Sequence, residues 1–385
     1  MRNLFTSESV SEGHPDKICD QVSDAILDAH LAGDRNSHVA CETLVTTNFC
    51  LLAGEVKSSV KIDFVDVARE TIRDIGYTLP GLGFHWEENK YLCLIHPQSS
   101  DIDQGVEAEH GAGDQGIMFG YACRETSAFM PYPIQIAHRL LERLSEIRKE
   151  GLLPWARPDA KSQVTVEYED DRPLHIREIL MSVHHADDAL EAEMEDDIRR
   201  KVIAPVLDTF DPHLDWNGHL LYNPSGRFAI GGPHGDSGLT GRKVIVDTYG
   251  GEGRHGGGAF SGKDPTKVDR SATYMARHIA KNIVASGAAD RCEVQLAYAI
   301  GKPEPRSVRV DTFGTESVDP LRIESAVREV FVLTPYAIIE YLDLQRPIYR
   351  RTAAFGHFGR NPGGDGTFTW EKTDRADDLR RLLLD

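Results

Sequence analysis

The sequence lacks the marks of several familiar protein classes. None of its six cysteines forms a CxxC pair or a Cys/His zinc spacing, which disfavours a zinc module and a disulfide framework. Nowhere do 18 apolar residues run together, and residues 1–17 contain no apolar core of a signal peptide. We therefore expect a cytosolic protein whose cysteines are mostly buried, reduced thiols.

Two catalytic signatures are also missing. The chain has neither a GxSxG nucleophile elbow nor a Cys/His signature. A near match to the phosphate-binding P-loop runs from Gly257 to Gly262-Lys263, but Asp264 stands where the pattern needs Ser or Thr, and no apolar strand precedes it. This excludes an ordinary P-loop NTPase. A reaction whose nucleophile has no proton to lose would need only positioning and stabilisation of the leaving group.

Positive charge is scarce and concentrated. The chain has 43 Lys and Arg against 61 Asp and Glu, a net charge of -18. Such a surface repels phosphate polymers and anionic lipid, so we expect no nucleic-acid partner and no membrane partner. Basic residues gathered in glycine-rich loops therefore indicate a local anion site on an acidic body.

The most informative stretch is residues 249–271, which contain seven glycines. Glycine lets backbone N–H groups come close to an anion, and here cationic side chains accompany it: Arg254, His255, Lys263, Lys267 and Arg270. Asp264 and Pro265 are predicted to cap and open a helix. The stretch is typical of a phosphate cradle, with a solvated surface loop as the alternative.

Three rounds of helix, strand pair, helix and extended segment follow one another along the chain. Pro15, Pro133 and Pro265 are predicted to open the first helix of each round. The strand pairs alternate apolar with polar residues, which suits antiparallel sheets with one solvated face. Segments 56–64, 244–249 and 337–349 are predicted to be extended.

These patterns predict an α+β fold of three similar α/β units in a pseudo-threefold arrangement. Helices would cover one side of each mixed or antiparallel sheet. The bare faces would then expose apolar patches, so we expect them to form a dimer interface.

Acidic residues in unusual settings complete the candidate site. His14, Asp16 and Lys17 begin the first helix. Further carboxylates lie in strands or between glycines: Glu42, Glu55, Asp114 and Asp236. Such groups can hold Mg²⁺ with phosphate and water completing its shell. The alternative for the first helix is that Asp16 only stabilises the helix dipole and His14 is a surface residue.

A second basic group, Arg242-Lys243, precedes the run 244–249, and Lys161 lies before a strand. Taken alone, Arg242 and Lys243 could be charges at a strand edge. Together with the glycine-rich stretch they supply enough positive charge for a polyphosphate.

Four motifs resemble the signatures of the S-adenosylmethionine synthetase family. They are FTSESVSEGHPDK (5–17), GAGDQG (111–116), GGPHGDSGLTGRKVIVDTYGG (231–251) and GRHGGGAFSGKDPTKVDRS (253–271). The similarity extends from Leu4 to the final helix. It implies that the sulfur of L-methionine attacks ribose C5′ of ATP, and that the expelled tripolyphosphate is hydrolysed to pyrophosphate and phosphate. A thioether has no proton to lose, in agreement with the missing base.

The resemblance also implies roles for individual residues. The implied catalytic residues are His14, Lys161, Arg242, Lys263 and Asp269. ATP would be bound by His14, Asp159, Lys161, Arg227, Phe228, Asp236, Arg242, Lys243, Ala259 and Lys263, and methionine by Glu55, Gln98, Asp236 and Lys267. Asp114 belongs to the active-site hexapeptide. Asp16 and Asp269 would bind the two Mg²⁺ ions of each active site, and Glu42 the K⁺ ion of each subunit.

The family organisation implies an N-terminal domain (1–99), a mobile active-site loop (100–110), a central domain (111–230), a C-terminal domain (231–372) and a C-terminal helix (373–385). It also implies a homotetramer, a dimer of dimers in which two subunits share each active site. The loop after Gln98 is shorter than in some relatives, and residues 361–367 form an apparent insertion.

Two other functions are alternatives for this sequence. A hydrolase acting on ATP or tripolyphosphate without methionine would be favoured by changes at the methionine positions, and a regulatory subunit by losses at His14, Asp16 or Lys263. All these positions keep the family's residues.

Overall fold

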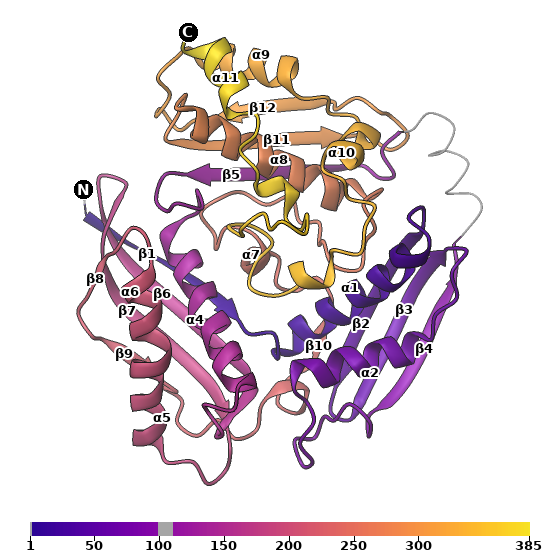
Figure 1. The fold of residues 1–385 in the computed structure, drawn as a ribbon, viewed down its shortest axis with the longest axis vertical. Helices are drawn as coiled ribbons and strands as arrows, with labels where there is room; N and C mark the ends of the chain where they lie inside the picture. Colours follow the sequence, from indigo (N-terminus) through magenta and orange to yellow (C-terminus); the bar gives the residue numbers. More distant parts are fainter. Residues whose placement is uncertain (1, 99–110) are drawn as a thin grey trace.

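The computed structural model describes residues 2–98 and 111–385, so the expected loop 100–110 lies outside the described residues. Three sheets lie around a common centre (Figure 1). The first runs in the order β10 (Gly238–Leu239), β2 (His38–Thr46), β3 (Phe49–Lys57), β4 (Lys90–Pro97). The second contains β1 (Arg2–Val10), β6 (Ala156–Glu169), β7 (Arg172–His185), β8 (Asp215–Trp216) and β9 (Leu220–Tyr222), and the third β12 (Ser307–Asp311), β11 (Arg291–Tyr298) and β5 (Gly116–Cys123).

The sheets exchange strands cyclically. β1 lies at the start of the chain but pairs with β6 of the second sheet. β5 precedes the second sheet's long strands but pairs with β11 of the third. β10 follows the second sheet but pairs with β2 of the first. Each sheet is therefore completed by a distant segment, which ties the three units into one body.

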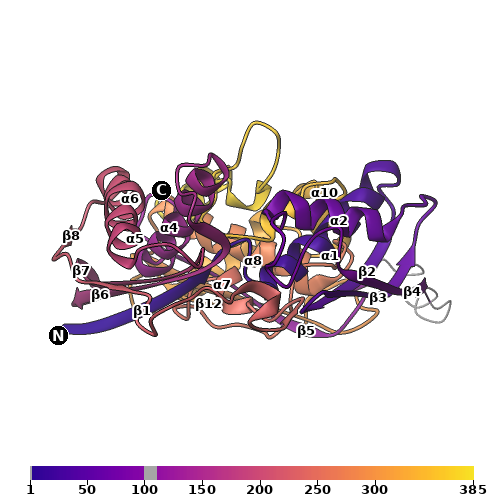
Figure 2. The same cartoon turned by 90° about the horizontal axis from the view of Figure 1, so that it is seen from below.

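Most pairings are antiparallel, while β3–β4, β7–β8 and β7–β9 are parallel. The prediction of three α/β units with mixed and antiparallel sheets is confirmed. In Figure 2 the helices lie on one side of the sheets. They are α1 (Pro15–Gly33), α2 (Phe64–Ile75), α4 (Tyr132–Lys149), α5 (Glu191–Asp197), α6 (Ala204–Thr209), α7 (Val244–Asp247), α8 (Val268–Ser286), α9 (Pro320–Val330), α10 (Pro335–Tyr341) and α11 (Ala376–Leu383). A π-helical segment, Ile198–Ile203, joins α5 to α6.

Four local predictions were wrong. Residues 58–63 form no strand, and the runs 244–249 and 337–349 contain the helices α7 and α10 instead of strands. The alternation of apolar residues in these short runs does not distinguish a buried helix from a strand. The helix after the glycine-rich stretch begins at Val268 and not at Pro265. The strand β5, which was not predicted, forms an edge of the third sheet beside β11.

Glycine allows the closest helix–sheet contact. A Cβ on Gly120 of β5 would lie 1.9 Å from the backbone carbon of Ala276 in α8. Only a residue without a side chain lets the two backbones approach so closely. Within residues 2–98 and 111–385, no helix is long and apolar enough to cross a membrane.

The sheet faces turned away from the helices carry apolar side chains. Leu92 and Leu94 of β4 are 45% and 46% exposed, and Ile117 of β5 is 46% exposed. Because Leu94 pairs with Ala53 in β3, and Ala53 pairs with Glu42 in β2, the side chains of Leu94 and Glu42 lie on the same face of the first sheet. An apolar face of this kind usually marks an interaction surface.

The C-terminal segment crosses the middle of the molecule, drawn in yellow in Figure 1. Trp370 is fully buried and stacks on Tyr274 of α8, with 3.8 Å between ring centroids. Next to it, the carboxylate of Glu371 accepts hydrogen bonds from Arg277 Nη2 (3.0 Å) and Lys281 Nζ (2.6 Å). Burial alone would raise the pKa of Glu371, but these two cations outweigh it and hold the pKa at about 2.

We expect Glu371→Gln to lower the free energy of unfolding by about 3 kcal/mol, because it leaves two buried cations without a carboxylate. Urea unfolding at pH 7 measures this. In the unchanged protein the same contribution is lost as the pH falls from 4.5 towards about 2, because the carboxyl is protonated earlier in the unfolded chain. Asp378→Asn, in a half-buried pair with Arg375 near the C-terminus, is the control. Equal midpoints for both variants would contradict this account.

Candidate active site

The first part of the site is the start of α1. Pro15 occupies the first helical turn, where its missing N–H costs nothing. His14 precedes it in an extended conformation, and its Nδ1 accepts the backbone N–H of Asp16 at 3.1 Å. Burial lowers the pKa of His14 to about 3, helped by the charges of Lys243 and Lys161. The imidazole is therefore neutral at pH 7 and carries its proton on Nε2, where it can donate a hydrogen bond.

Asp16 connects α1 to the segment around β10. Its Oδ1 accepts the backbone N–H of Leu239 (3.0 Å), and its Oδ2 accepts from Lys243 Nζ (2.5 Å). Arg242 Nε lies 3.8 Å from Oδ1. Burial alone would raise the pKa of Asp16, but the hydrogen bonds and the charge of Lys243 lower it. His14, Asp16, Arg242 and Lys243 thus lie together in one cluster.

The glycine-rich stretch forms the second part of the site. Lys263 bridges to Ala40 at the edge of β2, and its Nζ lies 2.7 Å from Asp269 Oδ2. A Cβ on Gly258 would lie 2.4 Å from the Asp269 carboxyl, so a larger residue there would displace this carboxylate. Asp264 does not cap the helix. Its Oδ1 accepts the backbone N–H of Thr266 (2.9 Å), which forms a tight turn before α8.

A cavity of about 310 Å³ lies between the first sheet and the glycine-rich stretch. Its lining includes Glu42, Glu55, Ala259 and Lys263. Glu42 and Glu55 project from β2 and β3 on the face that the helices leave uncovered, and both are exposed. Residues predicted to serve ATP, methionine and K⁺ therefore share one cavity.

The second sheet contributes Asp159 and Lys161 from β6. Burial raises the pKa of Asp159 to about 6, while its Oδ2 accepts the backbone N–H of Gly232 (2.8 Å). Lys161 is exposed on the uncovered face of β6. Its charge lowers the pKa of His14, so the two residues act on each other electrostatically.

The remaining predicted residues make contacts of their own. Arg227 pairs with Asp187 beside a cavity of about 150 Å³, and the backbone N–H of Phe228 donates to His185. Lys267 Nζ donates to buried Asp264 at 2.6 Å.

Three other predicted residues lie in loops or at a strand end. Asp114 and Asp236 are exposed and accept the N–H of the residue that follows each of them. Gln98 follows β4 and donates its backbone N–H to Val56.

Sequence reasoning missed the buried carboxylates behind the site. Lys17 is fully buried and donates to Asp20 Oδ2 (2.9 Å) and to Asp247 of α7. Burial raises the pKa of Asp247 to about 7, although Lys17 opposes the shift. The available signal was the four-residue spacing of aspartates in α1, which places them on one helix face.

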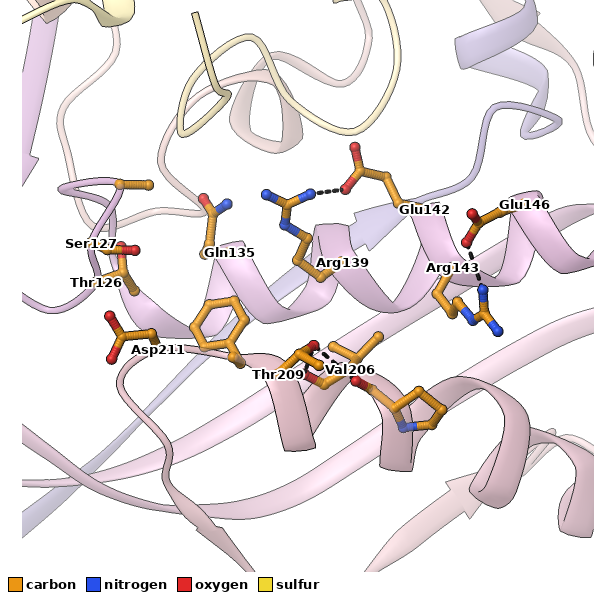
Figure 3. Close-up of a pocket in the computed structure, with 13 residues that line it drawn as sticks. Thr126, Ser127, Gln135, Arg139, Glu142, Arg143, Glu146, Val206, Thr209 and Asp211 are labelled. Carbon is orange, nitrogen blue, oxygen red and sulfur yellow. Dashed lines mark hydrogen bonds and ion pairs between the residues drawn. The ribbon is translucent and has the colours of Figure 1, made fainter. Parts of the chain in front are cut away.

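A larger cavity, of about 780 Å³, lies between α4 and α6 (Figure 3). None of the predicted site residues lines it. Two arginines on its α4 wall are already paired, Arg139 with Glu142 and Arg143 with Glu146, both at 2.7 Å. We therefore do not assign the active site to this cavity, although it is larger than the one beside Lys263.

The carboxylates fit a metal only in combination with substrate. Among the described residues, no three His, Cys, Asp or Glu side chains gather to hold an ion. Asp16 and Asp269 each offer a single carboxylate beside a lysine. Mg²⁺ binds proteins in this way, through one or two carboxylates with phosphate and water completing its shell.

Comparisons with known proteins show the family of the chain. Three family models match in succession: the N-terminal domain of S-adenosylmethionine synthetase over residues 2–100, the central domain over 109–228 and the C-terminal domain over 230–372. S-adenosylmethionine synthase of Desulfosudis oleivorans is 56% identical over 384 residues, which are 98% of each chain. That of Treponema denticola is 53% identical over 389 residues, covering 99% of this chain and 98% of its own. The chain belongs to the S-adenosylmethionine synthetase family.

Proposed function

We propose that this chain is a methionine adenosyltransferase, a transferase that forms S-adenosylmethionine from ATP and L-methionine. The tripolyphosphate that leaves is then hydrolysed to pyrophosphate and phosphate. The single observation that carries the site assignment is the clustering of His14, Asp16 and Lys243 at the start of α1. The full-length relatives, at 53% and 56% identity, support the activity.

For this reaction the protein must position the methionine sulfur against ribose C5′ and stabilise the negative charge of the leaving tripolyphosphate. The methionine sulfur attacks C5′ of the ribose, the C5′–O bond breaks, and its electron pair leaves on the tripolyphosphate. No base is needed, because the attacking lone pair carries no proton. Arg242, Lys243 and Lys263 supply positive charge where negative charge develops. Neutral His14 can donate its Nε2–H to the departing oxygen.

Further assignments rest on the family pattern and on local chemistry. We propose Asp16 and Asp269 as ligands of Mg²⁺, which would neutralise phosphate charge when bound, and Glu42 as a ligand of K⁺. Glu55, Gln98, Asp236 and Lys267 are proposed for methionine, and Asp114 for the shared site. Asp159, Lys161, Arg227, Phe228 and Ala259 are proposed to bind the nucleotide. The boundaries 99, 111, 231 and 373 remain proposals for the domains.

We propose a cytoplasmic location for this enzyme. All six cysteines are free thiols, and five of them are buried. Reduced cysteines without disulfides suit a reducing compartment.

Incubation with ATP, methionine, Mg²⁺ and K⁺ tests the activity. We expect a sulfonium product by mass spectrometry together with phosphate and pyrophosphate. Lys263→Ala should reduce the rate at least about 100-fold, because a charge that stabilises the leaving group is lost. A Lys201→Ala variant, altered in the helical segment between α5 and α6 where Lys201 pairs with Asp197, is the control. Phosphate release that does not require methionine, without sulfonium, would favour the hydrolase instead.

We also propose that two subunits meet through their uncovered sheet faces and share active sites, as a dimer within a tetramer. Glu42, Glu55 and Lys161 project from these faces, so a substrate held by them would lie exposed in a single chain. The apolar Leu92 and Leu94 on the same side support association.

The double variant Leu92→Glu/Leu94→Glu should dissociate to monomers and lose activity, because it buries charge in the proposed interface. Sedimentation measures the mass. Leu321→Glu, on α9 and 74% exposed, should keep the native assembly. An active double variant of native mass would refute the proposed interface.

A further inference from the structure

Helix α1 carries aspartates at four-residue intervals: Asp16, Asp20, Asp24 and Asp28. This spacing places their side chains in one row along the helix. Asp20 and Asp24 have no exposed surface, and Asp16 is 2% exposed. Buried carboxylates are costly unless they are paired and hydrogen-bonded, so a row of them requires partners.

The four aspartates accept backbone N–H groups from three segments of the chain. Asp16 accepts that of Leu239 (3.0 Å) and Asp20 that of Gly241 (2.8 Å). Asp24 accepts that of Gly262 (2.8 Å). Asp28 accepts the N–H groups of Tyr349 (2.9 Å) and Arg350 (2.8 Å).

The two central contacts fall directly before basic residues of the site. Gly241 precedes Arg242-Lys243, and Gly262 precedes Lys263. Both glycines have φ of +80°, and a Cβ on Gly262 would lie 1.9 Å from the carbonyl oxygen of Cys41. A Cβ on Gly241 would lie 2.5 Å from the Cβ of Ala259, so the loop that contains Gly241 contacts the glycine-rich stretch.

Buried cations hold the aspartates in place. Lys17 Nζ donates to Asp20 Oδ2 at 2.9 Å. Arg270 donates to both oxygens of Asp24, at 2.7 and 2.9 Å, and also to the carbonyl of Lys263 at 3.1 Å. The loops are thus fixed to a rigid helix by charge-assisted hydrogen bonds, which are stronger than neutral ones.

We propose that Asp20 and Asp24 are positioning residues that set the separation of Lys243 and Lys263 and so shape the binding site for the triphosphate of the substrate. The inference rests on the proposed function, in which these lysines bind the phosphate chain. Asp20 and Asp24 act through the loop backbone and do not touch substrate. Asp28 makes the same kind of contact to a C-terminal segment that carries no proposed site residue, so it is a matched control.

Binding of inorganic tripolyphosphate with Mg²⁺, measured by calorimetry, tests this directly. Asp20→Ala removes the acceptor for Gly241 and should weaken binding about tenfold, the size of effect that loss of a supporting contact has at metal sites. It should raise KM for ATP and leave KM for methionine unchanged. Asp20→Asn keeps an oxygen acceptor and should restore most of the affinity. Asp28→Ala should lower the unfolding temperature without changing tripolyphosphate affinity.

Asp24→Asn provides a second test, because it keeps the acceptor for Gly262 while leaving Arg270 without its anion. It should unfold at a lower temperature but bind tripolyphosphate more tightly than Asp24→Ala. If Asp24→Ala does not fold, the comparison of Asp20→Ala with Asp20→Asn tests the inference. Native affinity in Asp20→Ala, or equal losses in Asp20→Ala and Asp28→Ala, would overturn the inference. A wild-type protein that neither binds tripolyphosphate nor forms sulfonium would instead refute the proposed function.

Discussion

The hydrogen bonds from the backbone of two glycine-rich loops to the carboxylates of α1 are the interactions on which the site depends. Loops rich in glycine gain access to phosphate but lose conformational order. Here Asp20 and Asp24 compensate, since Asp20 fixes Gly241, two residues before Lys243, and Asp24 fixes Gly262, directly before Lys263. The glycine-rich loops stay free of bulky side chains where the ligand approaches, and helix α1 holds their backbone in place on the opposite side. The buried cations Lys17 and Arg270 pair with Asp20 and Asp24 and so offset the cost of burying these two carboxylates.

The cyclic exchange of strands adds a second constraint. Because β10 belongs to the first sheet, the segment that leads to Lys243 is held against α1 and β2 at once. β5 starts beside the site, where a Cβ on Gly116 would lie 3.5 Å from Asp269 Oδ1. Segments far apart in the sequence are thereby brought to the uncovered faces of the sheets, where Glu42, Glu55 and the glycine-rich stretch meet.

The sequence allowed much of this to be predicted, for physical reasons. Proline at the start of α1 and the alternation in β2, β3, β6 and β7 are local signals, and the structure contains those elements. The grouping of His14, Asp16, Arg242 and Lys243 followed from motif chemistry. The roles of Asp20 and Asp247 could not be predicted from the sequence, because a buried carboxylate is recognised only when its distant partner is known. Helix α7 was missed because its three apolar residues, Val244 to Val246, fit either a strand or a helix turn.

A structure of the enzyme with Mg²⁺ and tripolyphosphate would show whether α1 positions the two loops around the phosphate chain. Phosphate oxygens should lie between Lys243 and Lys263, with Asp16 and Asp269 turned from these lysines towards metal ions. Gly241 and Gly262 should keep their hydrogen bonds to Asp20 and Asp24. Tripolyphosphate bound instead in the cavity between α4 and α6, with the Lys263–Asp269 pair undisturbed, would contradict this arrangement.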